Sequence, residues 1–186
     1  MTVMPTKGAR HHGFTLIELL ITMIVGIVIV SFAVPSLTGF VKTHKVMTVA
    51  DSFNSAVSQA RSIAAATNSY VTVAPVDGDW KNGWQVFNEH ASPSGAFHVS
   101  EGDTLIAQYD NLPSDIAYTV NATNCANYVS FSPTGYSQNK DKAQMSLTIG
   151  FDITTAKRVV EVNLLGRARV CNPDRDGATC AMPARC

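Results

Sequence analysis

Two arginines near the C-terminus have the type and spacing needed to hold phosphate groups. Arg167 and Arg169 stand two residues apart, and in an extended chain such side chains point the same way about 6.6 Å apart. Each guanidinium presents a planar fork of N–H donors that suits phosphate oxygens. The pair therefore predicts contacts to successive phosphates along one nucleic-acid strand.

The segment around these arginines is basic, although the whole chain is not. The chain carries 14 basic and 14 acidic residues, and its first 13 residues hold two of the basic ones, so 12 remain against 14 beyond them. Binding of nucleic acid must therefore depend on a local patch. Residues 157–186 supply one, with basic Lys157, Arg158, Arg167, Arg169, Arg175 and Arg185 against acidic Glu161, Asp174 and Asp176.

No Phe, Trp or Tyr lies within residues 157–186, so we expect contacts to phosphate, with little sequence preference, rather than base stacking. The alternative is an ordinary solvated surface. Trp80 and Trp84 beside a glycine turn are a second place where bases could stack, but packing is the favoured interpretation of two such rings.

A carboxylate beside an apolar segment is the other chemically unusual feature. Glu18 precedes 23 uncharged residues, 19–41, and a helix that spans a bilayer needs about 20. A carboxylate inside such a helix is costly and is therefore a functional candidate. We expect its partner to be the amino terminus of a neighbouring subunit; the alternative is an acidic residue that reaches the lipid headgroups. Lys7 and Arg10 before it are typical of a cytoplasmic flank.

The sequence does not indicate catalysis. His44, His90 and His98 have neither metal-ligand spacing nor a nucleophile partner. Residues 172–177 begin like a calcium loop, but Pro183 occupies the position of the bidentate glutamate. The cysteines lack the Cys-x-x-Cys spacing typical of zinc sites. We expect no enzyme activity, no metal and no cofactor.

Four cysteines follow the apolar segment, and an even number in an exported domain predicts two disulfides. Four cysteines allow three connectivities. The favoured one joins Cys171 to Cys180, because this pair closes a short turn, and leaves Cys125 for Cys186. Such bridges would hold the arginines in place and reduce the ordering cost of binding.

These groups need a helix and a sheet domain to position them. We expect a helix over 14–66, whose part 14–41 meets the membrane or filament core and whose part 42–66 is amphipathic, with apolar residues at Val46, Val49, Phe53, Val57, Ala60 and Ile63 or Ala64. The period then changes to two, which predicts strands. They are expected at 70–74, 84–88, 104–109, 116–120, 128–131, 145–153 and 160–164, the last two as a hairpin.

The fold class predicted is therefore α+β: a long N-terminal helix packed on a mainly antiparallel β domain of two small sheets. The β domain is expected at 67–165. A basic, cysteine-containing tail follows at 166–186.

The N-terminal motif Gly13-Phe14-Thr-Leu-Ile-Glu18-Leu resembles the processing site of type IV pilins and type II secretion pseudopilins. The resemblance implies a leader at 1–13, cleavage by prepilin peptidase between Gly13 and Phe14, and N-methylation of Phe14. It also gives Glu18 a role in filament assembly. Because the small residue precedes the apolar core, the helix stays on the mature chain.

Three later blocks, at 80–87, 129–135 and 162–169, resemble those of the FimT/GspH family. Within the last block, Gly166-Arg167-Ala168-Arg169 is similar to the Gly-Arg-x-Arg motif of FimT-like pilins that bind DNA, placed at the end of the last strand. This implies a DNA site at Gly166, Arg167 and Arg169. Lys157, Arg158, Arg175 and Arg185 are further candidates.

The resemblance implies a minor type IV pilin that is not an enzyme and binds double-stranded DNA for uptake in natural transformation. One helix would anchor it in the bacterial inner membrane, with the β domain in the periplasm, before it joins other major and minor pilins in a filament. The alternative is a GspH-like minor pseudopilin of type II secretion that binds no nucleic acid.

Overall fold

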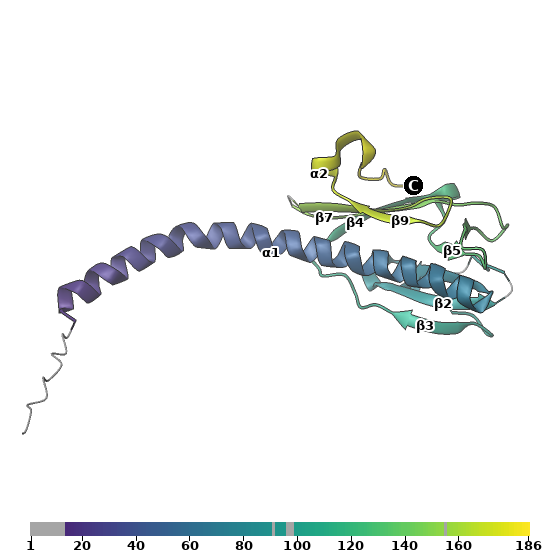
Figure 1. Ribbon diagram of the computed structural model, residues 1–186, viewed down its shortest axis with the longest axis horizontal. Helices are drawn as coiled ribbons and strands as arrows, with labels where there is room; N and C mark the ends of the chain where they lie inside the picture. The colour runs from purple at the N-terminus through teal and green to yellow at the C-terminus, as the bar shows by residue number, and fades with distance from the viewer. Residues whose placement is uncertain (1–13, 91, 96–98, 155) are drawn as a thin grey trace, which may run out of the picture. The chain divides into compact units, whose positions relative to one another are not determined.

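The structure is a computed structural model that describes residues 14–90, 92–95, 99–154 and 156–186, with the backbone alone at 33–36. The chain divides into an N-terminal unit, Met1–Phe40, and a larger unit, Val41–Cys186. Helix α1 spans Leu16–Thr67 (Figure 1). The expected leader, including Gly13, lies outside the described residues.

The described part of the N-terminal unit is an apolar helix. Its mean hydropathy reaches 2.7 over an 18-residue window in which no residue is buried. Among the described residues, α1 is the one helix long and apolar enough to cross a bilayer. Such a continuous exposed apolar surface is typical of a segment that meets lipid or other helices.

Within the larger unit, α1 contributes one apolar face to the core. Seven of its side chains are fully buried at intervals of three and four residues, namely Val46, Ala50, Phe53, Ala56, Val57, Ala60 and Ala64. Val49 and Ile63 are partly buried beside them. The predicted stripe is therefore confirmed, with small alanines that let strands approach the helix closely.

Two antiparallel sheets complete this unit (Figure 1). The five-stranded sheet has the order β3-β2-β1-β5-β6, formed by Thr104–Gln108, Trp84–His90, Tyr70–Pro75, Val129–Phe131 and Ser137–Gln138. The four-stranded sheet has the order β4-β7-β8-β9, formed by Ala117–Ala122, Leu147–Ile153, Ala156–Val162 and Ala168–Cys171. A short helix α2, Pro173–Asp176, follows β9. The predicted fold class is confirmed.

Two strands were not predicted, and one of them, β9, carries the candidate site residues Arg169 and Cys171. β6 has two residues and β9 has four, too few for an alternating pattern to stand out. β9 lies in the segment expected to be a tail, so the Gly-Arg-x-Arg motif precedes and enters the last strand instead of ending it. The expected β7–β8 hairpin is present, paired from Leu147↔Val162 to Ile153↔Ala156, and Thr155 in its turn lies outside the described residues.

Aromatic packing around Phe53 joins α1 to the β strands. The ring of Phe53 meets Trp80 and Trp84 edge-on, at centroid distances of 5.5 and 5.3 Å. Both tryptophans are buried, and Trp80 Nε1 donates a 2.7 Å hydrogen bond to Asn127 Oδ1. The two indoles therefore belong to the core, as the packing interpretation predicted, and are not a platform for bases.

Candidate nucleic-acid interface

The turn between β8 and β9 presents the first predicted arginine. Gly166 N donates to Asn163 O at 2.9 Å, and Asn163 N donates to Arg167 O at 3.0 Å. The Asn163 side chain accepts from Leu165 N and Arg167 N, each at 3.0 Å, as asparagine commonly does in turns. These bonds fix the backbone from which Arg167 projects.

Gly166 has two reasons to be glycine. Its φ is +71°, a left-handed conformation that other residues adopt at a cost. A Cβ there would also lie 2.3 Å from Gly135 O in the turn before β6. The glycine of the Gly-Arg-x-Arg motif therefore allows two turns to pack in contact, and its role is structural.

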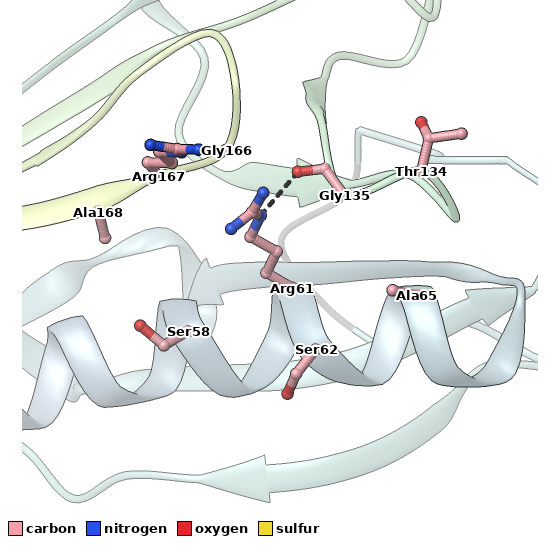
Figure 2. Close-up of a pocket in the computed structure, with 9 residues that line it drawn as sticks. All are labelled: Ser58, Arg61, Ser62, Ala65, Thr134, Gly135, Gly166, Arg167 and Ala168. Carbon is pink, nitrogen blue, oxygen red and sulfur yellow. Dashed lines mark hydrogen bonds between the residues drawn. The ribbon is translucent and has the colours of Figure 1, made fainter.

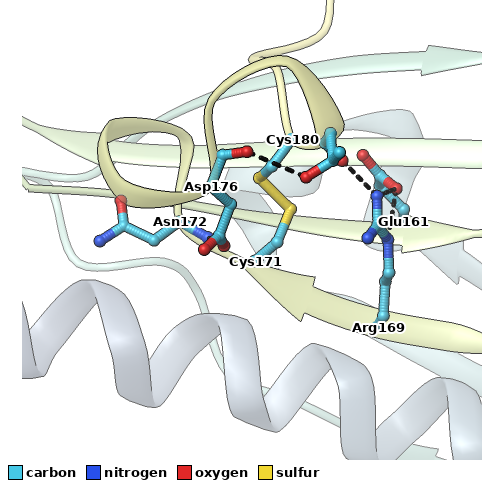
Figure 3. Close-up of polar contacts among 7 residues, drawn as sticks. Glu161, Arg169, Cys171, Asn172, Asp176 and Cys180 are labelled. Carbon is cyan, nitrogen blue, oxygen red and sulfur yellow. Dashed lines mark hydrogen bonds and ion pairs between the residues drawn. A yellow bond between two sulfur atoms is a disulfide. The ribbon is translucent and has the colours of Figure 1, made fainter.

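Arg167 and Arg169 have different surroundings. Arg167 is exposed, and its guanidinium has no hydrogen bond or ion pair to any residue that the structure describes. Arg169 in β9 lies opposite Glu161 in β8, and its Nη2 and Nε lie 2.7 and 2.8 Å from Glu161 Oε2 (Figure 3). Its Nη2 also donates to Thr179 O. Glu161 therefore offsets the charge of Arg169, while that of Arg167 remains available.

The other candidate cations lie apart from this turn. Arg158 Nη1 donates a 2.6 Å hydrogen bond to Lys157 O. Arg158 and Arg175 line a cavity of about 490 Å³ that also contains Asp51 and Asp176. Arg185 is exposed near the C-terminus. The positive charge predicted from the sequence is thus divided among several places and is partly matched by acidic groups.

The last residues are held by one disulfide. Cys171, at the end of β9, is bonded to Cys180 across helix α2 (Figure 3), which is the pairing that the turn argument favoured. Asn172 Oδ1 accepts from Asp174 N, and Asp176 Oδ2 accepts from Asn172 N. In the segment that begins like a calcium loop, these side-chain oxygens therefore accept hydrogen bonds from backbone N–H groups of their own turn.

The second predicted disulfide is not formed. Cys125 and Cys186 are exposed free thiols, although their side chains are hydrogen-bonded to each other. Cys186 lies outside any helix or strand, and its Sγ donates to Ala122 O at 3.8 Å instead of forming the bond to Cys125, which has strict geometry. The hydrogen bond from Cys125 lowers the pKa of Cys186 and raises the pKa of Cys125.

Arg61 is a neighbour of Arg167 that sequence reasoning missed. This half-buried residue of α1 donates a 2.9 Å hydrogen bond from Nε to Gly135 O. Arg61 and Arg167 line the same cavity of about 540 Å³ (Figure 2). In the sequence Arg61 is simply a polar residue of an amphipathic helix. The signal that could have found it is the pair of glycine turns at Gly135 and Gly166, which contact each other and line the same cavity as Arg61.

At the N-terminal site, the described residues begin at Phe14. Phe14 is 81% exposed, and Glu18 is exposed in the first turn of α1. Glu18 N donates to Thr15 Oγ1 at 3.2 Å, half of the reciprocal Thr-x-x-Glu arrangement that caps helix N-termini. Helix capping is therefore one contribution of this segment, separate from the predicted role of the carboxylate in assembly. His98 and Gly13 lie outside the described residues.

Two parts of the chain match known protein families. Residues 49–166 match the family described as type II transport protein GspH. Residues 8–34 match the prokaryotic N-terminal methylation motif. The GspH match ends at Gly166. Arg61 lies within the matched range, and Arg167 and Arg169 lie immediately beyond it.

Two crystal structures of the type IV minor pilin FimU from Pseudomonas aeruginosa, strain PAO1, are similar in fold. One has a TM-score of 0.54 and 16% identity, covering 73% of this chain and 95% of FimU. The other has a TM-score of 0.50 and 17% identity, covering 69% and 94%. No significant match to a curated protein sequence was found. The chain therefore belongs to the GspH family of pseudopilins and minor type IV pilins.

Proposed function

We propose that this chain is a minor type IV pilin that binds double-stranded DNA for uptake in natural transformation. The observation that carries the proposal is Arg167, an exposed guanidinium without a partner among the described residues, held on a turn fixed by Asn163 and Gly166. Because such a group can pair with any phosphate, binding should show little sequence preference.

The N-terminal half supplies the pilin part of the proposal. Prepilin peptidase would cut between Gly13 and Phe14, and Phe14 would be methylated, in agreement with the methylation motif over residues 8–34. Before assembly the apolar helix anchors the chain in the inner membrane, with the β domain in the periplasm. In the filament the same helix packs against other major and minor pilins, and the Glu18 carboxylate pairs with a neighbouring amino terminus. The proposal includes no catalytic role and no cofactor.

A second candidate function has its own support. Because the GspH match covers residues 49–166 and stops before Arg167, the matched domain suits a minor pseudopilin of type II secretion equally well. In that case the tail would be ordinary surface. The difference between the two functions thus rests on residues 167–186.

DNA binding by the full-length protein in a non-ionic detergent tests the proposal. Fluorescence anisotropy with several unrelated duplexes should give similar, modest affinities that fall as salt rises, because released counterions drive phosphate binding. Replacing both Arg167 and Arg169 with glutamine should weaken binding to all duplexes alike. In cells, the same variant should assemble into pili and fail in transformation. A wild-type protein that binds no duplex at low salt would favour the secretion pseudopilin.

A further inference from the structure

The cavity beside Arg167 is lined by two positively charged side chains. Arg61 and Arg167 both line it, and no acidic residue does. By contrast, the cavity at Arg158 and Arg175 includes two aspartates. Two cations that share a cavity without a counter-charge repel each other, and an anion between them removes this repulsion.

Arg61 is held in a fixed position before any ligand arrives. Its Nε donates to Gly135 O at 2.9 Å, which orients the guanidinium and leaves the two terminal nitrogens as further donors. Figure 2 shows Arg61 rising from α1 towards the turns that carry Gly135 and Gly166. A prepositioned arginine loses less conformational freedom on binding than a mobile surface side chain.

The remaining lining suits entry of an anion. Ser58, Ser62 and Ala65 follow one face of α1 along the cavity, at the spacing that places helical side chains side by side. All three side chains are small, so they leave space for a ligand beside the helix. The volume of about 540 Å³ lies in the usual range of about 300–1,000 Å³ for ligand sites.

We infer that this cavity binds a phosphate oxyanion, with Arg61 and Arg167 as its two ligands. Resting on the proposed function, the inference assigns the cavity to a backbone phosphate of the bound DNA. Arg61, from the helix, thus takes the place that the sequence suggested for Arg169, whose guanidinium is bound to Glu161.

A charge placed in the cavity tests the site without removing Arg61. Ser58→Glu adds a carboxylate one turn from Arg61 on the same face of α1. The control is Gln59→Glu, which adds the same charge at an exposed residue that does not line the cavity. Ser58→Glu should weaken duplex binding by on the order of tenfold at about 0.1 M salt, the loss expected for one phosphate contact, and Gln59→Glu by clearly less.

Arg61→Gln should give a loss similar to that of Ser58→Glu. Because Arg61 also donates a hydrogen bond to Gly135 O, the thermal melting of the Arg61→Gln variant must be measured as well. The Ser58→Glu variant keeps that hydrogen bond, so its loss of binding is separate from any loss of stability. If the wild type binds DNA and Ser58→Glu binds it no more weakly than Gln59→Glu does, the proposed function stands and the cavity assignment is wrong.

Inorganic phosphate distinguishes a free anion from DNA. Phosphorus NMR of phosphate, with chloride holding ionic strength constant, should show line broadening by the wild-type protein and by Gln59→Glu, and not by Ser58→Glu. If the wild type binds phosphate in this way but binds no duplex, the proposed function fails while the cavity remains a site for small oxyanions. Equal broadening by all three proteins, or broadening by none, overturns the site.

Discussion

At the scale of single residues, the structure gives two neighbouring residues of one short motif different surroundings. Gly166 allows the turn before β9 to touch the turn at Gly135, whereas Arg167 faces solvent and the cavity shared with Arg61. A substitution at Gly166 should therefore act on folding, and one at Arg167 on binding.

Replacing Gly166 with alanine should destabilise the domain strongly. The positive φ alone costs an alanine about 1 kcal/mol, and the new Cβ would also collide with Gly135 O. Gly102→Ala is the control, because Gly102 also has a positive φ, +93°, and open space around its Cβ position. Melting followed by tryptophan fluorescence should show a larger loss for Gly166→Ala. Equal losses would mean that the two turns relax apart.

The two free thiols should differ in their response to pH. Since the hydrogen bond from Cys125 lowers the pKa of Cys186, Cys186 forms its thiolate at lower pH and should react first with iodoacetamide as pH rises towards the usual thiol pKa of about 8.5. Peptide mass mapping after a brief exposure measures this order. In Cys125→Ala, which has no side-chain donor, the Cys186 reaction should shift to higher pH. Faster labelling of Cys125 would contradict the assigned direction of the hydrogen bond.

Some residue roles could be predicted from the sequence and others could not. The exposed Arg167 and the Cys171–Cys180 pair depend on local spacing, which the sequence displays. The partner of Arg169 depends on β9 lying beside β8, and the position of Arg61 depends on α1 meeting two turns that are distant in the sequence. Contacts of this kind form only when distant elements pack together, so the local spacing of residues in the sequence does not predict them.

At the scale of elements, α1 gives the β domain its central packing surface. Phe53 meets Trp80, Trp84 and Phe151, so its ring in α1 contacts β2, β7 and the short 3-10 helix before β2. Edge-on ring contacts of this kind add to the gain from burial. The amphipathic period of 42–66 predicted this face correctly, because it depends on local spacing alone.

Phe53→Ala should therefore destabilise the domain by about 3–5 kcal/mol, the usual cost of removing a buried aromatic ring. The fluorescence of Trp80 and Trp84 reports this loss directly, since the domain contains both tryptophans of the chain. Gln59→Ala, at an exposed position of the same helix, should change stability by less than about 0.5 kcal/mol. A small effect at Phe53 would show that the aromatic cluster repacks around the gap.

At the scale of the whole molecule, the two units meet different surroundings. The first is an exposed apolar helix with Glu18 near its start, and the second buries its apolar residues in its own core. The apolar run, the change of period after 67 and the antiparallel domain were readable from the sequence, because each covers many residues. The short strands β6 and β9 were not, because their patterns are too brief.

Neutralising Glu18 should separate membrane insertion from filament assembly. Glu18→Gln and Glu18→Val should both yield a processed, inserted protein that is lost from sheared pili, since each removes the charge proposed to pair with a neighbouring amino terminus. Intact-mass analysis of the mature chain and quantification of the pilus fraction measure the two steps. Normal assembly of Glu18→Gln would contradict the proposed charge pairing.

The salt dependence of DNA binding by single variants tests the central claim most directly. For the wild type, log K should fall linearly with log salt at about 0.9 per phosphate contacted. Arg167→Gln should lower that slope by about 0.9, Arg169→Gln should lower it less because Glu161 already holds that guanidinium, and Glu161→Gln should strengthen binding. No binding by the wild type at low salt, or an unchanged slope in Arg167→Gln, would contradict the account and leave a pseudopilin with a solvated tail.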